Sequence, residues 1–348
     1  MQIQDRQINK HESPYVIAEI GAGWRNLADA VRLVQAAADA KADAIKIQYY
    51  TPDEMTINSG SRDFILEKGS PWAGMKLYDL YKKAAMPWDV VETVFETAAQ
   101  EKIPVIASVF GLEGLRKMEA MDCAAYKIAS SENQYTGLIC EVIATEKPVI
   151  ISSGNLHPTQ FAECIVQCAD EMGNEDIGIL HCIPSYPTPP DRAQLHKIRQ
   201  LRNHFGDFEI GFSDHTLGSF IAPVAVALGA TIIEKHIGYP GSADGDFCLR
   251  NYEFPDFVMQ VKMAHSALRV HDDATPEEVA SHQWRRSIYV VKDIKAGDAF
   301  THDNIAVIRP SYGLTPDFLD LAFERRASVD IAAGTPLNLG HLSQEGIE

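Results

Sequence analysis

The chain has 348 residues, 46% of them apolar and 23% charged, which is the composition of an ordinary globular protein. Its formal net charge of −17 argues against binding to nucleic acid or to an anionic membrane surface. No stretch approaches the roughly 20 apolar residues of a membrane helix, and the first 15 residues are polar, unlike a secretory signal. We therefore expect a cytoplasmic protein.

Eight short apolar runs rich in Val and Ile follow one another as far as His236. Segments with helical periodicity lie between them, at 27–40, 88–100, 112–121 and 220–228. This alternation predicts a (β/α)8 TIM barrel, because an open doubly wound sheet would need a glycine-rich phosphate loop that residues 19–26 (EIGAGWRN) lack. The predicted strands are 15–20, 44–50, 104–108, 125–130, 148–154, 177–182, 208–215 and 231–236.

Each predicted strand ends in polar residues. In this fold the carboxyl ends of all strands face one active-site mouth. A single polar strand end has a structural explanation, whereas eight in register predict a substrate site. These residues are Glu19, Lys46, Gln48, Ser108, Lys127, Ser130, Ser152, Ser153, His181, Ser213, Asp214, His215, Glu234, Lys235 and His236.

The composition changes after residue 270. We expect a TIM-barrel domain over 1–270, a polar and acidic linker over 271–283, and a small β-rich domain over 284–348. A domain of about 60 residues is near the lower limit of independent stability, so it should pack on something. Within it, 292–300 (KDIKAGDAF) and 329–337 (VDIAAGTPL) resemble each other, which predicts two copies of a strand-turn unit.

The six cysteines show no Cys-x-x-Cys spacing, which agrees with a reducing compartment. Cys164 and Cys168 are four residues apart and could share a helix face. A metal pair is one interpretation of this spacing, and a face of small buried residues is the favoured one.

Seven motifs along the barrel resemble the sialic acid synthase family, which condenses phosphoenolpyruvate with an open-chain amino sugar to give a nine-carbon sugar acid. They are IAEIGA (17–22), IKIQ (45–48), AYKIASSE (125–132), PVIISSGN (148–155), HCIPSYPTP (181–189), GFSDHT (211–216) and ALGATIIEKH (227–236). The C-terminal segment resembles the antifreeze-like (SAF) domain of that family. Residues 50–84 and 309–318 resemble pseudaminic acid synthases more than N-acetylneuraminate synthases.

The resemblance implies that His215 and His236 bind a divalent metal, such as Mn²⁺, Co²⁺ or Mg²⁺, that holds the sugar aldehyde. Considered alone, a histidine at a strand end is more often a hydrogen-bonded structural residue. Two of them at the ends of adjacent strands favour the metal site.

Lys46 and Lys127 are charged residues inside apolar strands, where a solitary lysine is costly. One interpretation is a buried ion pair with Glu19 or Glu132. The favoured one is a cradle for the carboxylate and phosphate of phosphoenolpyruvate. Further donors to that anion would be the hydroxyls of Ser108, Ser130 and Ser152 and the backbone of 152–154 near a helix N-terminus.

Glu19 is the carboxylate expected to manage a proton or to stabilise the cationic centre, unless it is only an ion-pair partner. The resemblance implies that Gln48, Tyr186 and Asp244 contact the amino sugar, although Tyr186 could instead pack under its proline-rich loop. It also implies that Arg309 enters the partner's active site in a domain-swapped homodimer. The alternative for Arg309 is a surface residue beside a turn proline.

Three departures from the family pattern concern the substrate pocket. Gly23 and Trp24 occupy the position of an Asn-His pair, and Pro184 replaces a small polar residue. In the loop GSADGDF, Asp244 is favoured over Asp246 as the family's aspartate. Two rival functions stay open: an aldolase with a Schiff-base lysine, Lys127 or Lys46, and a barrel that binds a sugar without catalysis.

Overall fold

A computed structural model of the chain describes residues 1–67, 73–154, 165, 168–169, 173–174, 176–270 and 274–346. The chain divides into two compact units, Met1–Arg269 and Val270–Glu348. In the parts that the structure describes, no helix is long and apolar enough to cross a membrane.

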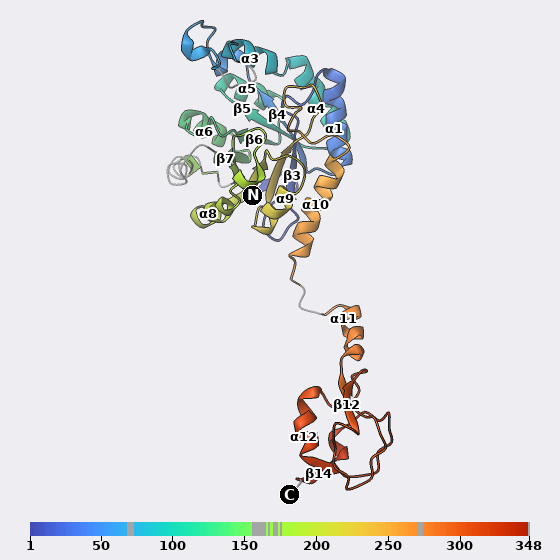
Figure 1. The fold of residues 1–348 in the computed structure, drawn as a ribbon. Coiled ribbons are helices and arrows are strands. Elements are labelled where there is room, and N and C mark those ends of the chain that lie inside the picture. The colour runs from blue at the N-terminus through green and yellow to red at the C-terminus, as the bar shows by residue number, and fades with distance from the viewer. Residues whose placement is uncertain are drawn as a thin grey trace. The chain divides into compact units, whose positions relative to one another are not determined.

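The first unit is a closed barrel of eight parallel strands, in the order β10-β3-β4-β5-β6-β7-β8-β9, which confirms the predicted fold class (Figure 1). Nearly every strand residue is buried, as expected where helices cover a parallel sheet. The strands are β3 (Tyr15–Glu19), β4 (Ala44–Tyr49), β5 (Val105–Val109), β6 (Ala125–Ile128), β7 (Val149–Ser152), β8 (Ile177–Cys182), β9 (Glu209–Asp214) and β10 (Ile232–His236).

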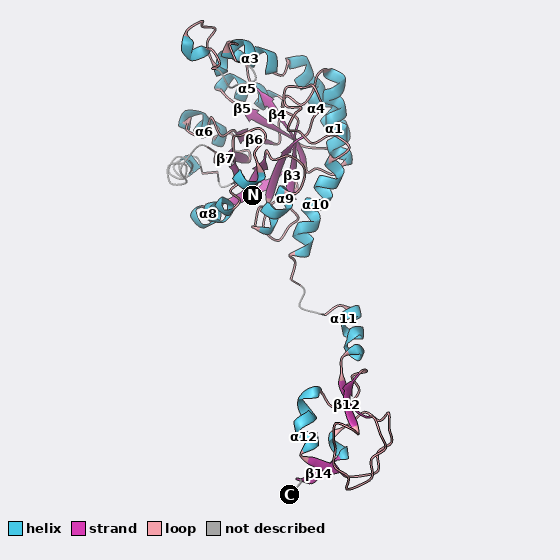
Figure 2. Cartoon of the chain, viewed as in Figure 1, coloured by secondary structure: helices cyan, strands magenta, loops and turns pink. Residues whose placement is uncertain are grey.

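Helices surround the strands, as Figure 2 shows. Their apolar faces pack on the sheet, as in the helix after β3, where Ala30, Leu33, Val34 and Ala37 are buried and Asn26 caps the first turn. The described helices of this unit are α1 (Leu27–Asp39), α2 (Pro52–Met55), α3 (Leu77–Ala84), α4 (Trp88–Glu101), α5 (Leu112–Ala120), α6 (Thr136–Ile143), α8 (His196–His204), α9 (Ile221–Ala227) and α10 (Phe254–Ala267), with short 3₁₀ turns at Arg62–Phe64 and Pro190–Arg192.

The polar N-terminal segment forms a small antiparallel hairpin of β1 (Gln2–Ile3) and β2 (Arg6–Gln7). Ile3 and Ile8 are buried in one cluster with inward-facing residues near the starts of the barrel strands, among them Ile17 and Ile106. This apolar cluster fills the amino-terminal end of the barrel, so the polar residues of the interior lie toward its carboxyl-terminal end.

The second unit pairs β11 (Ser287–Val290) with β12 (Ile305–Ile308) and β13 (Arg325–Ala327) with β14 (Leu342–Gly346), around its own apolar core. Its helices are α11 (Pro276–Ser281) and α12 (Leu319–Phe323), and three 3₁₀ turns lie at His282–Trp284, Pro316–Phe318 and Leu339–His341. The two similar segments meet, because Ile294 and Ile331 exchange backbone hydrogen bonds of 2.9 and 2.8 Å.

The predicted linker is partly helical, since α11 begins at a capping box formed by Thr275 and Glu278. Residues 271–273 of the linker lie outside the described part of the chain.

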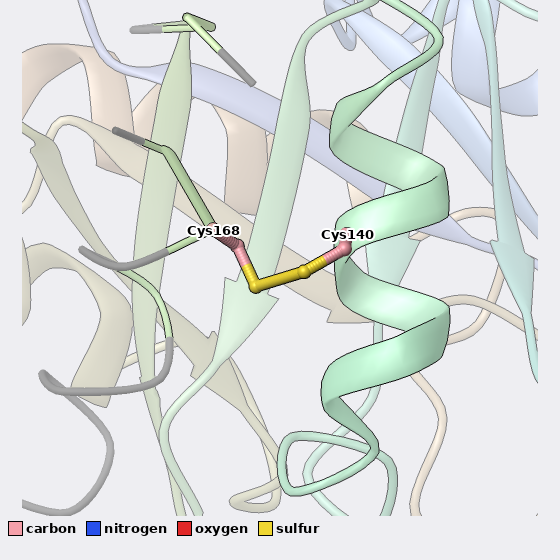
Figure 3. Close-up of a disulfide and its surroundings, with 2 residues drawn as sticks. All are labelled: Cys140 and Cys168. Atoms are coloured by element: carbon pink, nitrogen blue, oxygen red, sulfur yellow. A yellow bond between two sulfur atoms is a disulfide. The ribbon is translucent and has the colours of Figure 1, made fainter. Parts of the chain in front are cut away.

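A disulfide joins Cys140 of α6 to Cys168 (Figure 3). Cys168 is buried, as the favoured interpretation expects, but its sulfur is bonded to Cys140, which contradicts a metal pair with Cys164. Cys164 itself lies outside the described residues. The two bonded residues are 28 positions apart in the sequence, with Cα atoms 5.3 Å apart. Only the fold brings them together, so spacing could not reveal the pair. Cys123, Cys182 and Cys248 are free and buried.

Candidate active site at the carboxyl end of the barrel

A cavity of about 460 Å³ opens at the carboxyl ends of the barrel strands. This volume suits a small substrate or two. The structure brings most of the predicted site residues together in its wall, because their strands end at the same height. The predicted residues that line the cavity are Lys46, Gln48, Ser108, Lys127, Ser130, Ser152, Tyr186, Ser213, His215, Glu234 and His236.

Lys46, Lys127 and Glu234 form the floor of the cavity, and Glu19 lies behind them in the same charged cluster. Lys46 Nζ lies 2.8 Å from Glu19 Oε2 and 3.0 Å from Glu234 Oε2. Lys127 Nζ lies 3.8 Å from Glu234 Oε2 and donates a 2.6 Å hydrogen bond to Ser152 Oγ. The cluster is buried, and the formal charges of its two lysines and two glutamates cancel. The ion pair expected for Lys46 with Glu19 is present, whereas Lys127 pairs with Glu234 rather than with Glu132.

Burial acts on the pKa of Lys46 and of Glu234. It lowers the pKa of Lys46 to about 8, against the opposing attraction of Glu234, and the nearby charge of Lys127 lowers it further. Burial alone would raise the pKa of Glu234. The two ammonium groups outweigh it and hold that pKa below the usual value, so Glu234 is ionised.

The two predicted metal ligands lie side by side, with ring centroids 5.4 Å apart. His215 Nδ1 donates to Ile183 O at 2.9 Å, because a carbonyl can only accept. Burial, and then the neighbouring His236, lower the pKa of His215 to about 3, so its ring is neutral and Nε2 carries a lone pair. Ser213 Oγ lies 3.3 Å from Nε2 but gives its hydrogen to Glu234 at 2.8 Å, which leaves that lone pair available.

His236 completes this pair of imidazoles. Its Nδ1 is buried without a hydrogen-bond partner and lies 3.4 Å from Asp244 Oδ2. The neutral imidazole of His215 and the neighbouring imidazole of His236 fit the donor set of a divalent transition metal. Among the described residues no group of three His, Cys, Asp or Glu side chains is arranged around one point.

Glu132 is a site residue that the sequence suggested only as an ion-pair partner. It lines the cavity, and its Oε2 is buried without a hydrogen-bond partner. Burial raises the pKa of Glu132 to about 7, although the charge of Lys127 opposes this rise. A carboxyl of this kind exchanges a proton at neutral pH.

Aromatic rings form the remaining wall. Tyr186 lies over His215 with ring centroids 4.1 Å apart, and it faces the cavity rather than packing under its loop. On the other side Tyr50 contacts Phe110 and Tyr81 edge to face, at 5.2 and 5.9 Å. Tyr81 belongs to α3, one of the short helices between β4 and α4.

The loop after β3 explains one departure from the family pattern. A Cβ atom on Gly23 would lie 2.4 Å from Ile237 O and 2.9 Å from Gly238 Cα, so only glycine fits there. This close approach brings Asp244 over the site, where it accepts a 2.9 Å hydrogen bond from the Ala22 N–H. Burial would raise the pKa of Asp244, but the His236 contact and this hydrogen bond hold it below the usual value.

Several strand-end residues do not face the cavity, contrary to the prediction. His181 Nε2 donates a 2.7 Å hydrogen bond to Ala193 O, and its ring stacks on Phe212. Ser153, Asp214 and Lys235 are also absent from the cavity wall. The reason is the two-residue period of a strand, which turns every second side chain toward the helices. Glu19 lies behind the wall, where Lys46 and Gln48 hold its carboxylate.

The remaining predicted residues are placed as follows. Pro184 lines the cavity, Asp246 is exposed, and Asp244 is thus the aspartate beside His236. Arg309 is exposed at the end of β12 in the second unit. The helix expected after Gly154 lies outside the described residues.

Fold and site define the class of this protein, an eight-stranded β/α-barrel enzyme with two lysines and two histidines in its cavity. The chain belongs to the NeuB family, whose pattern it matches over residues 33–273, and residues 285–343 match the SAF domain. These matches confirm the predicted family and the identity of the C-terminal domain.

Known relatives agree with the predicted subgroup. The pseudaminic acid synthase of Campylobacter jejuni is 38% identical, over 97% of this chain and 99% of its own length. The N,N'-diacetyllegionaminic acid synthase of the same organism is 26% identical, over 86% and 91%. The crystal structure of N-acetylneuraminic acid (sialic acid) synthetase from Leptospira borgpetersenii, in complex with citrate, has a TM-score of 0.70 at 26% identity and covers 81% of this chain and 94% of its own.

Proposed function

We propose that this enzyme condenses phosphoenolpyruvate with an open-chain amino sugar, to give a nine-carbon sugar acid of the pseudaminic acid type and phosphate. The observation that carries the proposal is the cavity itself, which combines two buried lysines, two adjacent imidazoles and several hydroxyls at one barrel mouth. The 38% identity to a pseudaminic acid synthase supports the sugar class. Such a product belongs to polysaccharide biosynthesis, and we place the enzyme in the cytoplasm with its phosphoenolpyruvate supply.

The lysines would bind the anionic substrate. Lys46 and Lys127 supply the positive charge, and Ser108, Ser130 and Ser152 supply hydroxyl donors on the same wall. Ser130 Oγ is buried without a hydrogen-bond partner, so it has a donor to offer. These groups would hold the carboxylate and phosphate and direct carbon 3 of phosphoenolpyruvate toward the sugar aldehyde.

His215 and His236 would hold a divalent cation, Mn²⁺, Co²⁺ or Mg²⁺. Such a cation supplies Lewis-acid polarisation of the aldehyde oxygen. Gln48, Tyr186 and Asp244 surround this position and would orient the amino sugar.

Two carboxylates have different tasks in this proposal. Glu132 would give a proton to the aldehyde oxygen or take one from the incoming water, because its pKa of about 7 permits either state. Glu19 would act through Lys46, whose ammonium group it keeps in place at 2.8 Å.

Arg309 would complete the cavity of a partner subunit in a domain-swapped homodimer. Each unit separately carries exposed apolar side chains that suit an interface, namely Phe220, Met259 and Met263 in the first and Trp284 and Tyr312 in the second. A guanidinium also provides the planar donor geometry that a carbonyl or carboxylate of the sugar needs.

The test is a phosphate-release assay with phosphoenolpyruvate and a panel of aminohexoses, with mass detection of the product. We expect a nine-carbon acid, loss of turnover with EDTA, and recovery with Mn²⁺, Co²⁺ or Mg²⁺. A Schiff-base aldolase would instead survive EDTA and be trapped by borohydride with its carbonyl substrate. A barrel without catalytic function would bind sugar and release no phosphate.

A further inference from the structure

Directly behind the two histidines lies a buried ion pair that faces away from the cavity. Lys235 Nζ lies 3.0 Å from Asp214 Oδ2, and both side chains are almost completely inaccessible to solvent. The two residues are direct partners across β9 and β10, and each immediately precedes one of the histidines in the chain.

Thr216 forms hydrogen bonds with both residues of this pair. Asp214, Thr216 and Lys235 together form a hydrogen-bonded group around His215, which we call the bracket. Asp214 Oδ1 accepts hydrogen bonds from Thr216 N at 2.9 Å and from Thr216 Oγ1 at 2.7 Å. Lys235 Nζ also donates a hydrogen bond to Thr216 O. The residues before and after His215 are therefore both tied to the residue before His236.

Backbone hydrogen bonds anchor the histidines on their other sides. His215 O accepts from Thr188 N at 2.8 Å, and His236 O accepts from Leu249 N at 3.0 Å. The bracket of Asp214, Thr216 and Lys235 joins these two anchored strand ends on the side away from the cavity, as the hydrogen bond of Ser213 to Glu234 joins them on the cavity side.

Stability alone does not account for such a pair. Removing two charges from water is costly, and a protein with well-packed apolar residues of similar volume in their place is often as stable or more so. What a buried ion pair does supply is a fixed geometry, because its attraction and its hydrogen bonds tolerate only one arrangement. The geometry fixed here is the separation of two imidazoles.

We propose that the Lys235–Asp214 ion pair, together with Thr216, positions His215 and His236 and thereby sets the affinity of the metal site. This inference rests on the proposed metal-binding role of the two histidines. Residues that orient metal ligands typically change metal affinity by about 10- to 100-fold when they are replaced.

The test is Mn²⁺ binding to the purified full-length chain, measured by titration calorimetry without substrates. The informative variant is the double substitution Asp214→Asn and Lys235→Met, which removes both charges and keeps an oxygen for the Thr216 hydrogen bonds. We expect a Kd for Mn²⁺ about 10- to 100-fold weaker, with the circular dichroism spectrum retained. The Kd for phosphoenolpyruvate, measured in EDTA, should stay within about twofold, because the lysine cluster faces the cavity.

The matched control is Lys147→Met, the same lysine substitution at an ion pair with Glu119 and Asp122 on the outside of the barrel. It should leave the Kd for Mn²⁺ unchanged. If the double variant does not fold, Thr216→Val removes only the 2.7 Å side-chain bond and should still weaken Mn²⁺ binding several-fold. Lys235→Arg, which keeps the charge, should bind Mn²⁺ more tightly than the double variant or Thr216→Val.

An unchanged Kd for Mn²⁺ in a folded variant would overturn the inference. So would an equal loss of Mn²⁺ and phosphoenolpyruvate affinity, which marks a general structural role. If the unaltered chain itself binds no divalent metal, the proposed function is at fault rather than the positioning role.

Discussion

The burial of Glu132 should have a measurable effect on the free energy of unfolding. Replacing it with Gln keeps the shape of the side chain and removes its charge. The carboxylate oxygen Oε2 is buried without a hydrogen-bond partner, and burial raises the pKa of Glu132 from 4.5 to about 7. Above pH 7 the folded protein therefore carries a poorly solvated charge that the unfolded chain exposes to water.

The size of the effect follows from this pKa. A rise from 4.5 to about 7 corresponds to about 3 kcal/mol, because a tenfold change in an ionisation constant is about 1.4 kcal/mol. Glu132 is partly exposed, and screening by solvent lowers this to about 2 kcal/mol. The pKa of Glu132 is higher in the folded protein than in the unfolded chain. The stability that the protein has while Glu132 is protonated is therefore fully present below pH 4.5, and it is lost as the pH rises through 7.

Glu132→Gln should therefore raise the free energy of unfolding by about 2 kcal/mol at pH 8, and this gain should vanish as the pH falls toward 4.5. Urea unfolding of both proteins at a series of pH values measures it. The control Glu113→Gln, at an exposed helix position, should change stability by less than about 0.5 kcal/mol at every pH. The variant should also lose about 10²- to 10⁴-fold in turnover. A stabilisation that does not depend on pH, or a destabilisation at pH 8, would refute the reasoning.

Further predictions concern the lysine cluster, the chemistry and the dimer. Lys46→Met should lower the free energy of unfolding by about 3–5 kcal/mol in urea, because Glu19 and Glu234 stay behind as buried carboxylates; a change below about 1 kcal/mol would contradict the ion pairs. In the unaltered enzyme, kcat/KM for phosphoenolpyruvate should fall above about pH 8 as Lys46 loses its proton, and a flat profile to pH 10 would exclude it as the anion ligand. Turnover in ¹⁸O-water should label the sugar acid and not the phosphate by mass spectrometry, and the opposite pattern would rule out carbon–oxygen cleavage. Co-expressed Arg309→Ala and His236→Ala chains, each inactive alone, should regain activity as mixed dimers, and inactive mixed dimers would show that Arg309 does not act in trans.

The fold could be predicted closely from the sequence because each barrel strand is a short run of Val and Ile bounded by polar residues. For β8 the predicted bounds of 177–182 are those observed, and for β7 the predicted 148–154 shrinks to Val149–Ser152. Helices with an apolar stripe, such as α1, can be predicted from the sequence equally well.

The site could be predicted less completely, for two physical reasons. In the sequence each strand end is a continuous block of polar residues, whereas alternation along the strand separates Glu234 and His236, which face the cavity, from Lys235, which does not. The sequence also does not reveal which charged residues form ion pairs. Lys46 on β4 contacts Glu234 on β10 across the barrel interior, and those two strands are not neighbours. The pairing of Cys140 with Cys168 depends on the fold in the same way.

The neutral lysine and glutamate cluster has a consequence for the rate at which an anionic substrate arrives. Since the charges of Lys46 and Lys127 are cancelled by Glu19 and Glu234, the cavity floor offers little long-range attraction. An approaching anion instead meets the field of a chain with net charge −17. Dissolved salt shortens the reach of that field, to about 8 Å at physiological ionic strength. Association of phosphoenolpyruvate should therefore become faster as salt is added, and recognition begins only when the anion is close enough to compete with the glutamates for the ammonium groups.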